Sequence, residues 1–205
     1  MLSQLRPAFV MITAMTVLTG VAYPLAMTGA AQLLFPHQAN GSLLTIDAKV
    51  IGSSLVAQAF TDPGYFHPRP SAANYDGGAS TGSNLGPTSA ALKQRITADT
   101  ARLAAENPGV PVPVDLVTSS GSGLDPDLSP EAATFQAPRI AKARGLEAGQ
   151  LRDLIRRNTA GRGLGVLGAP RVNVLALNLA LDQLARNSAP GAQPGEPVAA
   201  NDGTR

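Results

Sequence analysis

Hydrophobic residues are concentrated at the beginning of the chain. No Asp, Glu, Lys or Arg occurs between Arg6 and Asp47, and residues 8–34 form an almost unbroken apolar run. Because a helix needs about 20 such residues to cross a bilayer, this run predicts one transmembrane helix. The alternative is a secretory signal peptide cleaved near Ala31, but the apolar part of such peptides is typically about 7–15 residues long.

The charges on the two sides of this run predict its orientation. Arg6 and the amino terminus precede it, whereas Lys49 is the first positive residue after it. Positive residues stay on the cytoplasmic side, so residues 1–7 are expected in the cytoplasm and residues from 35 onward outside it. Small residues at four-residue spacing would let another helix approach closely, although alanine and glycine are also common elsewhere in this chain. These candidate packing residues are Thr16, Gly20, Ala22 and Ala26.

The chain after the apolar run predicts a small, mainly helical domain of the α+β class over residues 35–187. Apolar pairs on both sides of Asp47 predict a β-hairpin at residues 41–52. Prolines and glycines are too frequent between residues 61 and 87 for regular structure. A loop of that length is unusual in a compact domain unless it is functional or packs on a partner, so it is the first candidate for an interface.

Periodic apolar positions predict helices in the second half of the chain. The sequence Ser129-Pro130-Glu131 is typical of a helix start. In the last predicted helix, Asn178, Asp182 and Arg186 form a polar row that we expect to face solvent. The tail, residues 188–205, is rich in Pro, Gly and Ala and is expected to be disordered. The predicted helices cover residues 89–107, 129–144, a segment from Leu151 to about Asn158, and 172–185, and residues 114–118 are predicted to form a strand.

Composition narrows the chemistry that the chain can support. It has no cysteine and only two histidines, His37 and His67, which argues against disulfides, thiol chemistry and a zinc site. The net charge is +2, the aromatic content is 4%, and no basic run occurs, so nucleic acid is not an expected partner.

Three patterns match catalytic or binding motifs but lack the required context. The G-x-S-x-G pattern around Ser80 follows no predicted strand, and both histidines precede it, whereas the hydrolase order puts the histidine last. Residues 163–168 fit G-x-G-x-x-G, but no strand precedes them and Pro170 obstructs the helix that should bind the phosphates. Asp125 and Asp127 fit a turn with helix-start acids better than a cation site. A secreted or membrane-anchored hydrolase remains the alternative function.

Several longer motifs, in a fixed order, resemble a known family. They are GSSL at 52–55, YFHPRPSA at 65–72, GSNLGP at 82–87, DLVT at 115–118, GSGLDP at 121–126 and the segment 164–182. Together they are similar to the C chain of the potassium-transporting ATPase, the KdpC subunit of the bacterial Kdp complex.

The resemblance implies an accessory, non-catalytic subunit of a high-affinity, ATP-driven potassium importer in the bacterial inner membrane. Its partners would be the A, B and F chains of the complex and the lipid bilayer. It implies no cofactor or metal of its own. The family has been described as a catalytic chaperone that raises the ATP affinity of the hydrolysing B chain, which would bring ATP into a transient complex with that chain, and Gln150 is the candidate nucleotide contact. The orientation predicted from Arg6, however, separates Gln150 from cytoplasmic ATP.

We therefore expect the exported domain to dock on the outer face of the channel-like A chain through the loop of residues 61–87. Any effect on ATP use would then be allosteric, which requires different contacts in two states of the pump. The candidate partner-contact residues are Tyr65, Phe66, Arg69 and Asn84.

Overall fold

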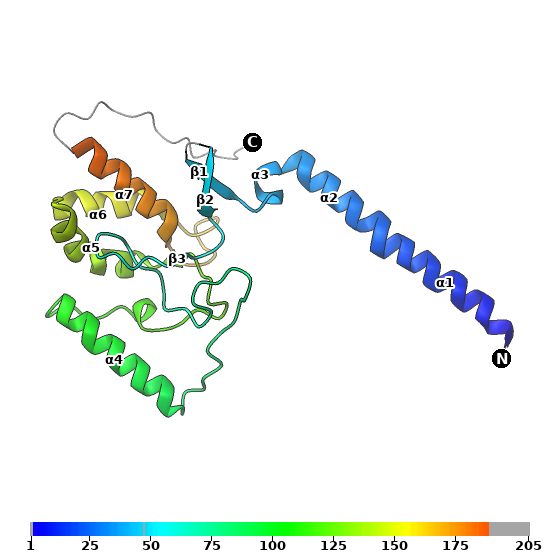
Figure 1. Cartoon of the computed structure of the whole chain (residues 1–205), viewed down its shortest axis with the longest axis horizontal. Coiled ribbons are helices and arrows are strands. Elements are labelled where there is room, and N and C mark those ends of the chain that lie inside the picture. Colours follow the sequence, from blue (N-terminus) through cyan, green and yellow to red (C-terminus); the bar gives the residue numbers. More distant parts are fainter. Residues whose placement is uncertain (1, 47, 189–205) are drawn as a thin grey trace. The chain divides into compact units, whose positions relative to one another are not determined.

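The computed structural model describes residues 2–46 and 48–188, which fall into two compact units that divide after Leu44 (Figure 1). The first unit is dominated by a continuous helix over Leu5–Leu34, which has a mean hydropathy of 1.7 and no buried residue in its most apolar window. The helix is long and apolar enough to cross a membrane, as residues 8–34 predicted, and it begins three residues earlier. It is preceded by a short 3-10 turn, η1 (Leu2–Gln4), and followed by α3 (Pro36–Ala39).

A π-helical turn interrupts this long helix. It consists of α1 (Leu5–Val17), the π turn η2 (Leu18–Ala22) and α2 (Tyr23–Leu34). Pro24 explains the interruption, because it has no N–H for the carbonyl of Gly20 and its ring crowds that carbonyl. The Tyr23 N–H bonds instead to the carbonyl of Leu18, five residues back.

The π turn lies within the two rows of small residues that the sequence suggested for helix packing. Thr16 precedes it, Gly20 and Ala22 belong to it, and Ala26 follows it. All four are exposed in this chain. Because a π turn contains more residues than an α turn, the rows do not continue in α-helical register from one side of it to the other. Their role in helix packing stays a prediction.

A β-hairpin and a long irregular segment come next along the chain. Strands β1 (Leu43–Ile46) and β2 (Lys49–Ser53) pair in a two-stranded sheet, as predicted for residues 41–52. Residues 54–89 then form neither helix nor strand before α4 (Ala90–Glu106). The predicted loop is therefore confirmed, and it is longer than residues 61–87.

The second half contains three more helices and a small sheet. Helix α5 (Pro130–Arg144) begins and ends as predicted, α6 (Ala148–Arg157) follows after a left-handed Gly145, and α7 (Val174–Ser188) is last. The predicted strand at 114–118 is wrong: η3 (Val114–Leu116) is a 3-10 turn that packs on α5. Leu116 and the next residue are both buried, so their burial does not alternate as in a strand exposed on one face.

The sequence patterns did not predict the second sheet. Its strands are β3 (Asp127–Leu128), β4 (Thr159–Ala160) and β5 (Arg171–Asn173), in the antiparallel order β3-β5-β4. The prediction that the last helix begins at Val172 is wrong, because Val172 lies in β5. Asn173 acts as the helix cap, since its side-chain oxygen accepts a hydrogen bond from the Ala176 N–H at 3.0 Å.

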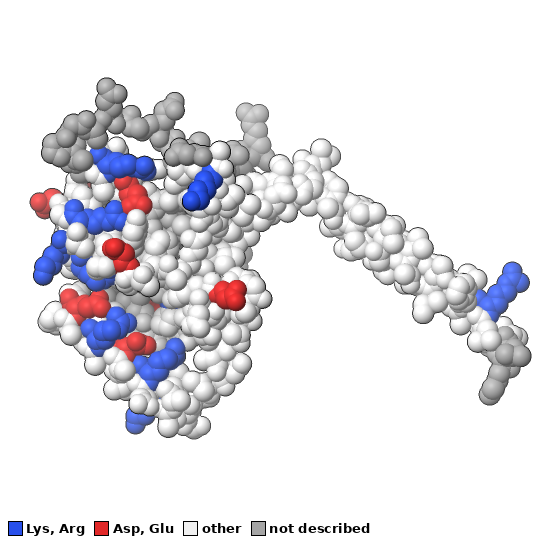
Figure 2. All heavy atoms as spheres, in the orientation of Figure 1, with Lys and Arg blue, Asp and Glu red and all other residues white. Residues whose placement is uncertain are grey.

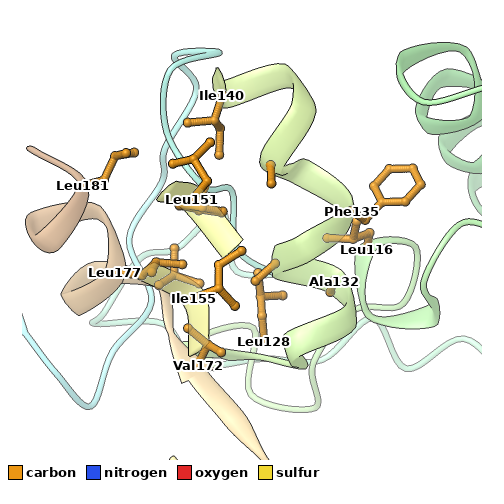
Figure 3. Packing of buried hydrophobic residues seen from close by; sticks show 14 of the residues in the cluster. Leu116, Leu128, Ala132, Phe135, Ile140, Leu151, Ile155, Val172, Leu177 and Leu181 are labelled. Atoms are coloured by element: carbon orange, nitrogen blue, oxygen red, sulfur yellow. The ribbon is translucent and has the colours of Figure 1, made fainter. Parts of the chain in front are cut away.

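The hydrophobic core lies between α5, α6, α7 and this sheet (Figure 3). Ile140 from α5, Leu151 and Ile155 from α6, Val172 from β5 and Leu177 from α7 are all between 0% and 3% exposed. Helix α4 adds one buried residue, Leu103. The fold is α+β, as expected, and the predicted tail lies outside the described residues except for Ser188, where α7 ends.

Candidate functional site

Two buried amide side chains hold the middle of the long loop. The Phe66 N–H donates to Asn178 Oδ1 at 2.8 Å, and Asn178 Nδ2 donates to the Phe66 carbonyl at 3.0 Å. Gln136 repeats this arrangement one residue later, since His67 N–H donates to its Oε1 at 2.8 Å and its Nε2 donates to the His67 carbonyl at 3.0 Å. Buried backbone groups need such partners, so α5 and α7 supply the hydrogen bonds that a neighbouring strand would supply in a sheet.

This arrangement changes the interpretation of two predicted positions. Phe66 is fully buried in the core, so its side chain fixes the loop and offers no surface in the domain as described. The prediction that the polar row of α7 faces solvent is wrong at Asn178, which is 1% exposed because its amide is consumed by the loop backbone.

Arg144 and Asp182 anchor the loop at Tyr65. The Arg144 guanidinium lies 4.3 Å from the centroid of the Tyr65 ring and 2.7 Å from Asp182 Oδ1, and its Nε donates to the Gly64 carbonyl at 2.8 Å. The Tyr65 hydroxyl donates to Asp182 Oδ2 at 3.1 Å. The neighbouring Arg139 donates to the carbonyls of Pro63 and Tyr65. Tyr65 is therefore partly buried, and its hydroxyl is engaged within the domain.

Arg69 links the loop to the segment before α5. Its Nη1 lies 3.0 Å from Asp125 Oδ2, and its Nη2 donates to Thr118 Oγ1 at 3.4 Å. Its carbonyl accepts a hydrogen bond from the Tyr75 hydroxyl at 2.9 Å. The charge that made Arg69 a candidate partner contact thus serves an internal ion pair.

Beyond these anchors the loop presents an exposed surface without charge, residues 77–88, which we call the neutral surface. The sequence has no charged residue between Asp76 and Lys93, and all of the neutral surface is exposed except Gly82 and Ser83. Figure 2 shows charged side chains gathered on one side of the domain, whereas a large area next to it is almost free of them. Asn84, the fourth candidate contact, belongs to the neutral surface and is exposed.

The neutral surface is fixed to the segment before β3. The Thr81 N–H donates to the Ser122 carbonyl at 2.9 Å, and the Ser80 hydroxyl donates to the same carbonyl at 3.0 Å. A Cβ on Gly82 would lie 2.9 Å from the Gly121 carbonyl, so only glycine allows this approach. The segment is irregular, but backbone contacts define its shape.

The catalytic patterns do not form sites. The Ser80 hydroxyl is bound to a backbone carbonyl, and His67 Nε2 lies 2.9 Å from the carbonyl of Asp62. Burial lowers the pKa of His67 below its usual 6.5, and the Asp62 carbonyl opposes that shift. Within residues 2–46 and 48–188, no group of three or more His, Cys, Asp or Glu could hold a metal ion. Asp125 is paired with Arg69, as described above, and Asp127 lies 3.0 Å from Arg171.

Gln150 has a structural function at the start of α6. Its Oε1 accepts a hydrogen bond from the Glu147 N–H at 3.1 Å, and the Glu147 side chain accepts one from the Gln150 N–H, which completes a capping box. Gln150 is exposed. Helix capping therefore accounts for this glutamine without a nucleotide.

Comparison with known proteins identifies the family to which this chain belongs. The family described as "KdpC: K+-transporting ATPase, c chain" matches residues 5–183. A potassium-transporting ATPase KdpC subunit from Methylobacterium nodulans is 61% identical over 199 residues, which cover 90% of this chain and 99% of that protein. Proteins of the same name from Methylorubrum extorquens and Rhodopseudomonas palustris are 59% and 56% identical over 200 residues, or 91% of this chain and 100% of each relative.

This chain therefore belongs to the KdpC family, as the motifs indicated. It is an accessory, non-catalytic subunit of a potassium import complex, and its apolar N-terminal helix fits a membrane anchor. Nothing favours the alternative of a hydrolase.

The sequence motifs located the loop and its interface candidates, but they missed the side chains that hold it. Gln136, Arg139 and Arg144 come from α5 and lie more than 65 residues from their loop partners. The sequence signal nearest to this arrangement was the polar row of α7, because Asn178 and Asp182 both bind the loop.

Proposed function

We propose that the domain after the membrane helix lies outside the cytoplasm and docks on the channel-like A chain through the neutral surface, residues 77–88. The main observation in support of this proposal is that the segment is exposed, uncharged and held in one shape by contacts with Gly121 and Ser122. The centres of protein interfaces are depleted in charged residues. A segment that is already ordered also loses little entropy on binding.

The docking test introduces charge into the neutral surface. Leu85 is 40% exposed and can be replaced without opening the core, so Leu85→Asp tests the surface itself. Val114→Asp is the matched control, because Val114 is an apolar residue that is 66% exposed outside the loop. We expect Leu85→Asp to reduce co-purification with the other chains and potassium uptake at low potassium, and the control to leave both unchanged. Equal complex yields for the two variants would contradict the proposed surface.

A second proposal concerns orientation in the inner membrane. Arg6 lies in the first turn of the apolar helix, and the next positive residue, Lys49, follows the helix, which favours a cytoplasmic amino terminus. The chain has no cysteine, so thiols introduced at the exposed residues Ser3 and Thr97 would be unique labels. An impermeant thiol reagent applied to cells with a permeable outer membrane should react at residue 97 and not at residue 3. The reverse pattern would overturn the orientation.

We further propose that the subunit affects ATP use without binding ATP itself. If the domain is outside the cytoplasm, the nucleotide is on the other side of the membrane, and the side chain of Gln150 is already engaged in the helix cap. Docking would then change ATP affinity only if the neutral surface binds one state of the pump more tightly than another. The A, B and F chains are the partners in this proposal.

A further inference from the structure

A short apolar turn protrudes from the domain between β4 and β5. All of residues 161–170 are exposed, and three large apolar side chains among them are 93% (Leu164), 74% (Val166) and 63% (Leu167) exposed. Single exposed hydrophobic residues are common on protein surfaces. Three within four positions form a cluster, and clusters of this kind mark interaction sites.

Hydrogen bonds hold the turn in one conformation. Gly163 and Leu167 exchange two backbone hydrogen bonds of 2.8 Å, and the Val166 N–H donates to the Gly163 carbonyl at 3.1 Å. Leu164 has a φ of +52°, a left-handed conformation that is unfavourable for a residue other than glycine. The turn therefore presents its most exposed leucine from a fixed and strained backbone, a combination typical of functional positions.

The surroundings of the turn in the sequence carry only positive charge. Between Leu154 and Leu181 the chain has four arginines and no Asp or Glu. Arg156 and Arg171 are paired with Asp153 and Asp127. Among the ion pairs of the described residues, neither Arg157 nor Arg162 takes part. Arg157 and Arg162 precede the apolar tip in the sequence and are both exposed, so their charges are available to an acidic partner.

We propose that this turn inserts into an apolar pocket with an acidic rim on another chain of the potassium-transporting ATPase. The inference rests on membership in that complex. It adds a second contact with the other chains, separate from the one proposed for the neutral surface. The apolar tip matches the pocket, and Arg157 and Arg162 match the rim by charge complementarity. A few buried side chains at the centre of an interface supply most of its affinity, which is the role assigned to Leu164.

A lipid surface is the other occupant with suitable chemistry, and two observations make it the weaker one. No aromatic residue occurs in residues 161–170, although Trp and Tyr are the usual anchors at a membrane interface. A fluid bilayer also accepts any shape, so it gains nothing from a turn with a fixed backbone. A protein pocket does gain from it, since preorganisation lowers the entropy lost on binding.

The test uses Leu164→Gly in the full chain, co-expressed with the other subunits. Glycine is favoured at a φ of +52°, so this variant keeps the turn and removes only the side chain. Leu55→Gly is the matched control, because Leu55 is also well exposed at 60%. We expect Leu164→Gly to weaken association with the complex by about tenfold or more, Arg162→Glu to weaken it less, and the control to have no effect.

The outcomes separate this inference from the proposed neutral surface. Loss of association in Leu85→Asp but not in Leu164→Gly would overturn the second contact and leave the first in place. Loss in Leu164→Gly but not in Leu85→Asp would support the turn and remove the neutral surface. Association of both variants at the level of the unmodified chain would overturn both.

A fluorescent label at Val166→Cys tests the lipid alternative. The chain has no other thiol. In detergent, the label should become shielded from a soluble quencher when the other chains bind, although no bilayer is present. In vesicles of phosphatidylglycerol and phosphatidylethanolamine with nitroxide-labelled lipids, the chain alone should show no quenching. Strong lipid quenching, or no shielding by the other chains, would overturn the proposal.

Discussion

Asn178 gives the most direct test of how the long loop is held. Its amide satisfies both backbone groups of Phe66, at 2.8 and 3.0 Å, and it is 1% exposed. Asn178→Leu keeps the number of side-chain heavy atoms but leaves a donor and an acceptor of the loop buried without partners. This substitution should therefore destabilise the domain much more than the substitution of an ordinary surface amide.

The size of the effect follows from these two backbone groups. Each buried group left without a partner costs about 1–3 kcal/mol, whereas the added apolar burial of leucine returns about 1–2 kcal/mol. The free energy of unfolding should fall by about 1–4 kcal/mol, out of about 5–15 kcal/mol for a typical domain. Gln94→Leu is the control, because Gln94 is exposed on α4, and it should change stability by less than about 0.5 kcal/mol.

The assay is guanidinium unfolding of the full chain in detergent, followed by far-ultraviolet circular dichroism. A lower midpoint with an unchanged slope would indicate a loss of stability alone. If Asn178→Leu unfolds at the same guanidinium concentration as the Gln94→Leu control, the two hydrogen bonds of the Asn178 amide do not hold the loop in solution.

The Asp variant at the same position adds a dependence on pH. Asn178→Asp keeps an acceptor for the Phe66 N–H, but burial would raise the pKa of the new carboxyl above its usual value. Its folded pKa would then exceed its unfolded pKa, so the stability of the variant is greatest at acid pH and falls as pH rises between the two values. The unmodified chain has no titrating group at this position, so the difference between the two proteins should widen over that interval.

Three further predictions concern other contacts of the domain. Gln150→Ala should lower the unfolding free energy by about 0.5–1 kcal/mol through loss of the helix cap, while the ATP concentration for half-maximal hydrolysis by the complex stays unchanged; a shift in that concentration would point to nucleotide contact. Arg144→Ala should cost about 2 kcal/mol in guanidinium unfolding, because it removes the contact with the Tyr65 ring and the ion pair with Asp182. Because burial lowers the pKa of His67, its neutral form favours the fold, and stability should be lost as pH falls below about 6.5; thermal unfolding at pH 7 and pH 5 should differ less in His67→Gln, and an equal difference would exclude this histidine as a cause.

The elements with strong local signals were predictable from the sequence. Ser129 and Pro130 specify the start of α5, and the run of apolar residues specifies the long first helix. The elements that failed depend on distant partners. Strand β5 is three residues long and pairs with segments that local periodicity does not connect, and Val172 shows the same apolar pattern in a strand as it would in a helix.

The candidate contacts were predictable as a region but not residue by residue. The frequent prolines and glycines singled out the loop, because they exclude regular structure. The motifs could not tell which of the loop's side chains point inward, since that depends on Asn178 and Asp182 in α7, more than 100 residues away. Asn84 lies on the neutral surface, whereas Phe66 fills the core.

This distinction determines which substitutions can identify a partner surface. Arg69→Glu would be expected to reduce assembly, but it would also replace an ion pair with Asp125 by two facing carboxylates, so the loop itself would be disturbed. A loss of transport in that variant could not be assigned to a lost partner contact. Leu85 and Leu164 avoid this ambiguity because they are exposed and no core packing depends on them. A loss of association at unchanged stability in either variant would therefore assign a contact to that surface.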